Sequence, residues 1–187
     1  MPNNVKRKNA GFSLVELLVV IAILGVLMGG TLITYFTVSS NNVKKAGGFI
    51  NDAMLECRNS AMSISAESWK VIITKEDVRV RKTESGGKII DKSGGELPKN
   101  VAVSVVRQNG NVSYDLFDPD TGYDSIEIEY KALSGEVRSV IAYKDDVKYE
   151  IYTEASSDIY CDIVCDYNNK TTYELRLYYS TGKHVEP

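Results

Sequence analysis

An apolar stretch near the amino terminus constrains this chain more than any other feature. Residues 12–35 are almost wholly apolar, and Glu16 is the only ionisable side chain among them. About 20 consecutive apolar residues are the length that a helix needs to cross the hydrocarbon core of a membrane. Lys6, Arg7 and Lys8 precede the stretch, and basic residues beside an apolar helix keep that end in the cytoplasm. The pattern predicts a membrane-spanning helix with the rest of the chain outside the cytoplasm.

Glu16 is costly at membrane depth unless a positive charge faces it. A carboxylate in the middle of a membrane helix costs roughly 2.5–3.5 kcal/mol on insertion scales, and the apolar run contains no Lys, Arg or His. Cleavage of the chain before Phe12 would create an α-amino group four residues from Glu16, on the same helical face. The carboxylate could pair with this amine in its own chain or in a neighbouring chain. Ser13 is suited to cap the helix in the uncleaved chain.

Gly11, Phe12 and Glu16, between a basic head and an apolar helix, resemble the class III signal of type IV pilins and type II secretion pseudopilins. The resemblance implies that a prepilin peptidase cuts between Gly11 and Phe12 and methylates the amino group of Phe12. It implies that the apolar helix stores the subunit in the membrane and then packs with other pilin or pseudopilin subunits in a filament core. It also implies an inner-membrane assembly platform and its ATPase as partners.

The alternative interpretations of this stretch are a secretory signal peptide and a plain signal anchor. A secretory signal has an apolar region of about 7–15 residues that ends in a small-residue cleavage site. The run here is longer, no such site follows it, and a plain anchor has no need of Glu16.

The next segment predicts that the helix continues with one apolar face. Apolar residues recur at steps of three and four, which is the spacing of a helical stripe. Gly47 and Gly48 interrupt the pattern, so we expect a bend or a soft point there. The stripe consists of Val43, Ala46, Ile50, Ala53, Met54, Cys57, Ala61 and Ile64.

After about residue 65 the apolar period changes from 3.6 to 2, which indicates strands. Two Ser-Gly-Gly copies, at 85–87 and 93–95, predict loops around a short or edge strand at 88–91. A helix followed by many antiparallel strands predicts an α+β fold in which the helix packs against a sheet. The expected strands are 69–74, 78–82, 101–107, 112–117, 125–130, 137–143, 147–153, 158–167 and 172–179.

The domain plan that follows is a cleaved leader at 1–11, a transmembrane and filament-core helix at 12–38, its amphipathic continuation at 39–66 and a β-rich body at 67–187. Arg58 and Ala61 on the helix, with the early hairpin after them, are similar to the minor-pilin group that includes the type II secretion pseudopilin H and FimT.

Composition and motifs argue against an enzyme and a cofactor. The formal net charge is −3, and His184 is the one histidine, so a centre built on several histidines is excluded. No phosphate-binding glycine loop or nucleophile elbow is present. Residues 141–187 carry nine Asp or Glu and five Lys or Arg, so a nucleic-acid partner is not expected.

Cys57, Cys161 and Cys165 leave three interpretations open. In a strand, Cys161 and Cys165 lie about 13 Å apart, whereas a disulfide needs Cα atoms within about 7 Å. If their segment formed a turn or helix, the two could form the carboxy-terminal disulfide loop familiar from many pilins. Cys57 on the helix stripe could instead bridge helix and sheet, or all three could be reduced thiols in the core.

Asp118, Asp120 and Asp124 partly fit a calcium loop. In the EF-hand pattern, glycine occupies the sixth position of the loop, and here the sixth position is Tyr123. A turn rich in Asp, Pro and Gly is therefore the favoured interpretation, and calcium binding stays a weak candidate.

The sequence thus predicts a structural subunit, a minor pilin or a pseudopilin. It would be a single-pass membrane protein with a cytoplasmic amino terminus, later assembled into a type IV pilus or a type II secretion or competence pseudopilus. The competing hypothesis is a membrane-anchored extracellular binding module that never polymerises.

Overall fold

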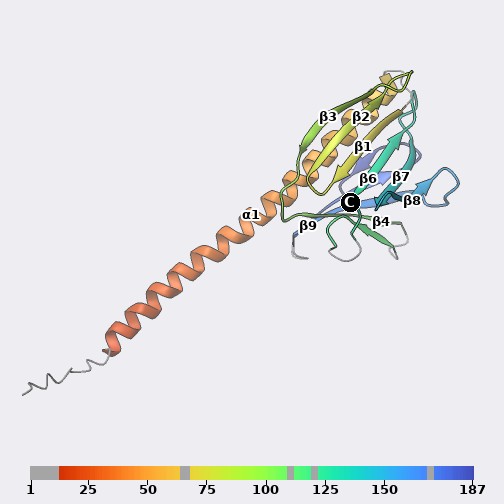
Figure 1. The fold of residues 1–187 in the computed structure, drawn as a ribbon. Helices are drawn as coiled ribbons and strands as arrows, with labels where there is room; N and C mark the ends of the chain where they lie inside the picture. Colours follow the sequence, from red (N-terminus) through yellow and green to blue (C-terminus); the bar gives the residue numbers. More distant parts are fainter. Residues whose placement is uncertain (1–12, 64–67, 109–111, 119–121, 168–170) are drawn as a thin grey trace, which may run out of the picture. The chain divides into compact units, whose positions relative to one another are not determined.

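The computed structural model describes residues 13–63, 68–108, 112–118, 122–167 and 171–187. The chain divides into two compact units, Met1–Val38 and Ser39–Pro187, which are described separately. Figure 1 shows the elements in chain order. They are α1 (Leu14–Ser63), β1 (Ser68–Thr74), β2 (Asp77–Thr83), β3 (Ile89–Glu96), β4 (Ala102–Arg107), β5 (Ser113–Asp115), β6 (Ser125–Tyr130), β7 (Val137–Lys144), β8 (Val147–Thr153), β9 (Tyr160–Tyr167), β10 (Thr171–Tyr178) and β11 (His184–Val185).

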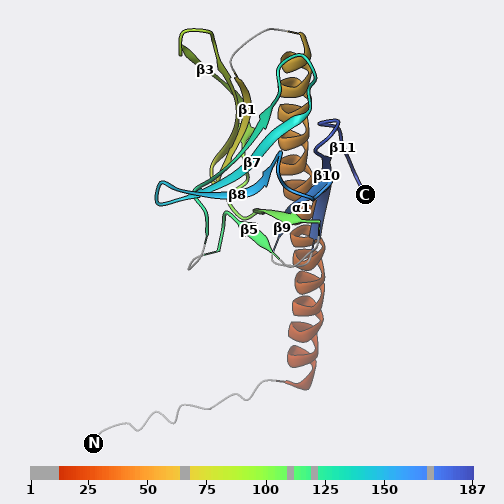
Figure 2. The same cartoon turned by 90° about the vertical axis from the view of Figure 1, so that its right-hand side faces the viewer.

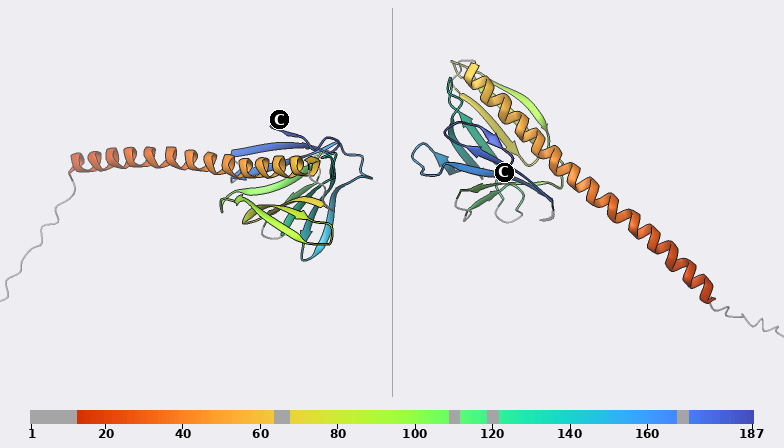
Figure 3. Two further views of the ribbon diagram at one scale, coloured as in Figure 1. Left: turned by 90° about the horizontal axis from the view of Figure 1, so that it is seen from above. Right: turned by 180° about the vertical axis from the view of Figure 1, so that it is seen from behind.

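The second unit contains two antiparallel sheets. The first has the strand order β3-β2-β1-β6-β7-β8, and the second has the order β11-β10-β9-β4-β5. In Figures 2 and 3, strands of the first sheet lie on one side of α1, and β10 and β11 lie on its other side. The α+β fold class is confirmed, but the strands form two sheets rather than the single one expected. The reason is that β9 pairs with β4, far away in sequence, and local periodicity does not reveal such a pairing.

The predicted stripe on α1 supplies the helical part of the core. Its seven described members are at most 2% exposed, which confirms the period-3.6 interpretation; Ile64 lies outside the described residues. From the sheets, Val71 and Ile73 of β1 and Val103 and Val105 of β4 are fully buried against the same core. The seven helix residues are Val43, Ala46, Ile50, Ala53, Met54, Cys57 and Ala61.

The helix α1 continues without a break through Gly47 and Gly48, where a bend or a soft point is expected. A Cβ atom on Gly47 would lie 2.0 Å from Cδ1 of Tyr173, so the tyrosine ring from β10 packs directly on the helix backbone. Nothing lies within 4 Å of a Cβ placed on Gly48. Gly47 is therefore needed for close approach rather than for flexibility.

The edge strand expected near residue 90 is confirmed, since β3 is the first strand of its sheet. The second Ser-Gly-Gly copy, however, lies within β3 and not in a loop. The β2–β3 register shifts between Val78 and Arg79, which marks a bulge. A Cβ atom on Gly95 would lie 2.6 Å from the ring of Phe49, and Gly95 has a φ of 135°. These glycines let the bulged strand pass close to α1.

The two adjacent helix glycines give a matched test of this packing. Gly47→Ala should lower the free energy of unfolding by about 1–3 kcal/mol, the usual cost of overpacking, although alanine is the better helix former. Gly48→Ala, with open space at its Cβ, should raise it by up to about 1 kcal/mol. Denaturant unfolding of the full chain in neutral detergent, followed by circular dichroism, measures both. Equal stabilisation by the two substitutions would contradict the Tyr173 contact.

Candidate functional site

The helix α1 begins with a reciprocal cap that uses Glu16. Oε2 of Glu16 accepts a hydrogen bond from the backbone N–H of Ser13 at 3.0 Å. Oγ of Ser13 accepts from the N–H of Val15 at 3.4 Å, and the Ser13 carbonyl accepts from the N–H of Leu17 at 3.1 Å. This is the capping box, in which a serine and an acid three residues later satisfy backbone donors at a helix start. The pattern Ser-x-x-Glu signals the box in the sequence, and it gives Glu16 a role beyond the ion pair that the missing counter-charge predicts.

The cap places the carboxylate of Glu16 at the positive end of the helix dipole. Gly11 and Phe12, the predicted cleavage and methylation residues, lie outside the described residues, as do Lys6, Arg7 and Lys8. Phe12 directly precedes Ser13, whose N–H Glu16 binds. A new amino group on Phe12 would therefore arise one residue from a group that Glu16 already reaches.

The helix surface that follows the cap is apolar and uncovered. Every side chain from Leu14 to Met28 is exposed. Leu14 is 80% exposed and Val26 is 78% exposed, values that are ordinary for a lysine and unusual for an aliphatic residue. This stretch makes no core of its own within the described residues. Such a surface is suited to contact lipid or the apolar helices of other chains.

Among the described residues, no helix has both the length and the apolarity that crossing a membrane requires. Residue 12 and the side chains of residues 30–36, which belong to the predicted span, lie outside the described residues.

All three cysteines are free thiols in the core. Cys57, Cys161 and Cys165 are fully buried, and the last two lie on the same face of β9. Burial raises the pKa of the Cys161 and Cys165 thiols to about 12, and it also raises the pKa of Cys57. The turn or helix that a Cys161–Cys165 disulfide would need is not formed, because the segment is a regular strand.

The calcium candidate is not assembled in the part of the chain that the structure describes. Asp124 accepts a hydrogen bond from the backbone N–H of Asp145 at 2.8 Å, and the Asp118 carbonyl accepts from the N–H of Gly122 at 2.9 Å. Asp120 lies outside the described residues. Among those described, no group of three or more His, Cys, Asp or Glu side chains is placed to hold a metal.

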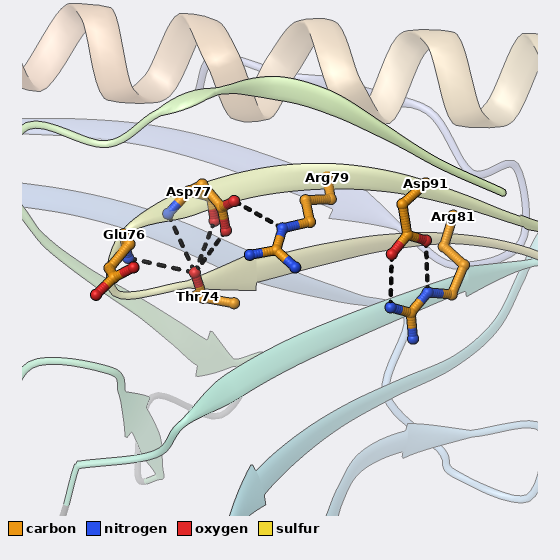
Figure 4. A network of polar contacts seen from close by, with 6 residues as sticks. All are labelled: Thr74, Glu76, Asp77, Arg79, Arg81 and Asp91. Carbon is orange, nitrogen blue, oxygen red and sulfur yellow. Dashed lines mark hydrogen bonds and ion pairs between the residues drawn. The ribbon is translucent and has the colours of Figure 1, made fainter. Parts of the chain in front are cut away.

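The outer face of the first sheet carries ion pairs between neighbouring strands. Arg81 of β2 binds Asp91 of β3 through two hydrogen bonds of 2.7 and 2.8 Å, as Figure 4 shows. The hydrogen bond from Arg81 lowers the pKa of the Asp91 carboxyl group. Lys70 of β1 lies 3.0 Å from Glu127 of β6. These carboxylates are paired on a solvated surface, which is a structural arrangement rather than a catalytic one.

His184 lies in the short strand β11, where burial and the nearby Arg58 lower the pKa of its imidazole. Arg58 donates from Nε to the Thr181 carbonyl at 2.9 Å and so stays close to the strand. Because the folded state resists protonation of His184, the unfolded chain takes up the proton first as the pH falls below about 6.5. Stability is therefore lost on acidification through this window.

The expected result is a lower melting temperature at pH 5.5 than at pH 7.5 for the full chain. The substitution His184→Gln should remove most of that difference, because glutamine does not titrate. The pKa of Asp91 and that of Glu84 are lowered from values below 5, so these acids titrate outside this window. Thermal unfolding at both pH values measures the effect, and an unchanged pH difference in His184→Gln would refute it.

The amino-terminal segment matches one known family model. Residues 6–32 match the model described as the prokaryotic N-terminal methylation motif. Comparison with curated proteins and with solved structures found no match to this chain. The motif supports a type IV pilin-like protein that is processed as a prepilin. It covers the segment that contains Gly11, Phe12 and the Ser13–Glu16 cap, and it does not extend to the body.

Proposed function

We propose that this chain is a minor pilin or pseudopilin, cleaved between Gly11 and Phe12, methylated at Phe12 and assembled through its apolar helix into a filament. The methylation motif at residues 6–32 is the observation that carries the proposal. The exposed apolar surface at Leu14–Met28 supports it, because that surface is left for other helices to cover. The filament is a type IV pilus or a type II secretion or competence pseudopilus.

In this proposal Glu16 changes partner as the subunit matures. In the uncleaved chain its carboxylate accepts the hydrogen bond from the Ser13 N–H. Cleavage adds a charged amine at Phe12, one residue before Ser13. The carboxylate of Glu16 can then form an ion pair with such an amine in place of the hydrogen bond from the uncharged Ser13 N–H. In the apolar filament core, an unpaired carboxylate costs several kcal/mol. Glu16 therefore pairs with the Phe12 amine of an adjacent subunit and sets the axial register.

The remaining steps follow from the class of protein. A prepilin peptidase and an assembly platform with its ATPase act on the chain at the inner membrane, where the helix at 12–38 is the anchor and the body is extracytoplasmic. Extraction then moves the apolar helix from lipid into contact with other subunits, so that the apolar surface is covered in both states. The finished subunit lies in an extracellular filament.

The competing candidate is a membrane-anchored extracellular binding module that does not polymerise. The pilin-like subunit and the anchored module differ in how the amino terminus is processed. Co-expression with a prepilin peptidase should yield a protein whose intact mass corresponds to a chain that begins at Phe12 and carries one methyl group. Gly11→Val should block this cleavage, and Ala10→Val should not. An intact mass that still begins at Met1, with an active peptidase on a control substrate, would favour the anchored module.

Two substitutions at Glu16 separate its cap from its ion pair. Glu16→Gln keeps a hydrogen-bond acceptor for the Ser13 N–H, since glutamine also serves in a capping box, but it removes the charge. Glu16→Ala removes both. We expect normal membrane insertion and normal cleavage in both variants. Filament incorporation should fall at least about tenfold in both, which corresponds to a loss of about 1.4 kcal/mol or more in the free energy of association. Immunoblots of sheared filaments against cell-bound protein measure it.

Normal incorporation of Glu16→Gln, together with failure of Glu16→Ala, would show that the cap alone matters. Normal incorporation of both variants would exclude any role of Glu16 in assembly.

A further inference from the structure

A cavity of about 340 Å³ opens beside the turn between β6 and β7. This is near the lower limit of small-molecule pockets, which range over about 300–1,000 Å³, so the space suits one side chain or a small polar group. It lies wholly within the second unit. Its lining comes from three parts of the chain that only the fold brings together: Lys131, Glu136, Val137, Tyr152, Glu154, Tyr179 and Ser180.

The charges of the cavity favour a cation. Nζ of Lys131 lies 3.0 Å from Oε2 of Glu136 and 3.2 Å from Oε1 of Glu154. Two carboxylates thus share one ammonium group, which leaves the cluster with a net charge of −1. Each ion pair uses one oxygen of its carboxylate, and a carboxylate can accept hydrogen bonds on both oxygens. An incoming cation would find acceptors on both glutamates.

An aromatic wall adds to this preference. The rings of Tyr152 and Tyr179 stack with centroids 3.6 Å apart and an angle of 14° between their planes. Tyr179 is 1% exposed, so it fixes the half-buried ring of Tyr152 in place. Burial raises the pKa of the Tyr152 hydroxyl. A tyrosine ring beside carboxylates is a favourable surface for an ammonium or guanidinium group.

The turn that forms the rim is held rigidly. The N–H of Lys131 donates to the Glu136 carbonyl at 2.8 Å, and the N–H of Leu133 donates to the Ala61 carbonyl at the end of α1, also at 2.8 Å. Gly135 packs on Met62 with a φ of 70°. Leu133 itself has a φ of 70° and is 75% exposed. Holding a leucine in the left-handed region costs roughly 1–2 kcal/mol, and here the strained residue presents an apolar side chain to solvent.

We propose that this cavity binds the side chain of an arginine or lysine on a partner polypeptide, with an apolar residue next to it packing on Leu133. The cavity fits the cation by charge and by its aromatic wall, and the exposed Leu133, in the turn between the lining residues Lys131 and Glu136, distinguishes a peptide from a free small cation. Nothing in the prepilin signal bears on this site, so the inference goes beyond the proposed function and is tested without it.

The first test uses N-acetyl-arginine amide as the probe and N-acetyl-citrulline amide as its uncharged isostere. The full chain, in non-ionic detergent, carries labelled methyl groups on leucine and valine. The arginine compound should shift the Val137 signal saturably, and citrulline should bind up to about fivefold more weakly, the usual upper limit for a solvated ion pair. An absent or equal response would overturn the proposal.

Three variants sharpen this test. Glu136→Gln with Glu154→Gln should weaken binding of the arginine compound by about three- to fivefold. Lys131→Gln should strengthen binding of the arginine compound, because the ammonium group that now pairs with Glu136 and Glu154 is removed. Glu150→Gln on β8, whose partner is Lys148 and which does not line the cavity, should leave it unchanged. Weaker binding in Lys131→Gln would refute the assignment of the cavity to cations.

The second test asks whether the ligand is a peptide. N-acetyl-leucyl-arginine amide should bind more tightly than the single residue, and Leu133→Ser should abolish that gain while leaving N-acetyl-arginine amide unaffected. Spermidine should show no dependence on Leu133. If spermidine bound more tightly than the dipeptide, the site would be one for free polyamines and the partner polypeptide would be excluded.

Discussion

The body depends on burial of one stripe of α1 between two sheets. Val43, Ala46, Ile50 and Met54 are completely buried in the same core cluster as residues of both sheets. The stripe is made of small and medium side chains. Gly47, which has no side chain, lets the ring of Tyr173 pack directly against the helix backbone. Since packing on a helix of this kind tolerates little extra volume, the same feature limits which substitutions the helix accepts.

The same helix element has the opposite character in its first part, where aliphatic side chains from Leu14 to Met28 are exposed. Such a surface is unfavourable in water by roughly 25 cal/mol per Å², so it requires lipid or other helices. The Ser13–Glu16 cap makes the helix start self-sufficient in the uncleaved chain. Under the proposed function, cleavage then converts Glu16 from a local cap into a contact between subunits, with no change in the helix itself.

Features with a strong local period were predictable, and features that depend on packing between distant segments were not. The stripe from Val43 to Ala61 and strands such as β1 and β6 follow from periods of 3.6 and 2, and both were confirmed. The division into two sheets was missed because it depends on the pairing of β4 with β9. Gly94 and Gly95 look like part of a loop in sequence, whereas within β3 a Cβ on Gly95 would meet the ring of Phe49 and a Cβ on Gly94 would meet Ala53 and Val78.

The candidate sites divide in the same way. Ser13 and Glu16 are three residues apart, so their box is readable from the chain, whereas Lys131, Tyr152 and Tyr179 come together only in the folded chain.

Under the proposed function the chain assembles through its apolar helix, and the open sheet faces of the body must not aggregate. Ile72 and Ile141 lie on the outer face of the first sheet, on either side of Glu127 in the ladder, yet each is only 6% exposed. Charged neighbours on the adjacent strands cover them, since long charged side chains shield apolar surface with their stems. Individually such surface ion pairs add little stability, about 0–1 kcal/mol. Their value here is that they cover Ile72 and Ile141 on this face of the first sheet, so that under the proposed function this face does not compete with the helix for association.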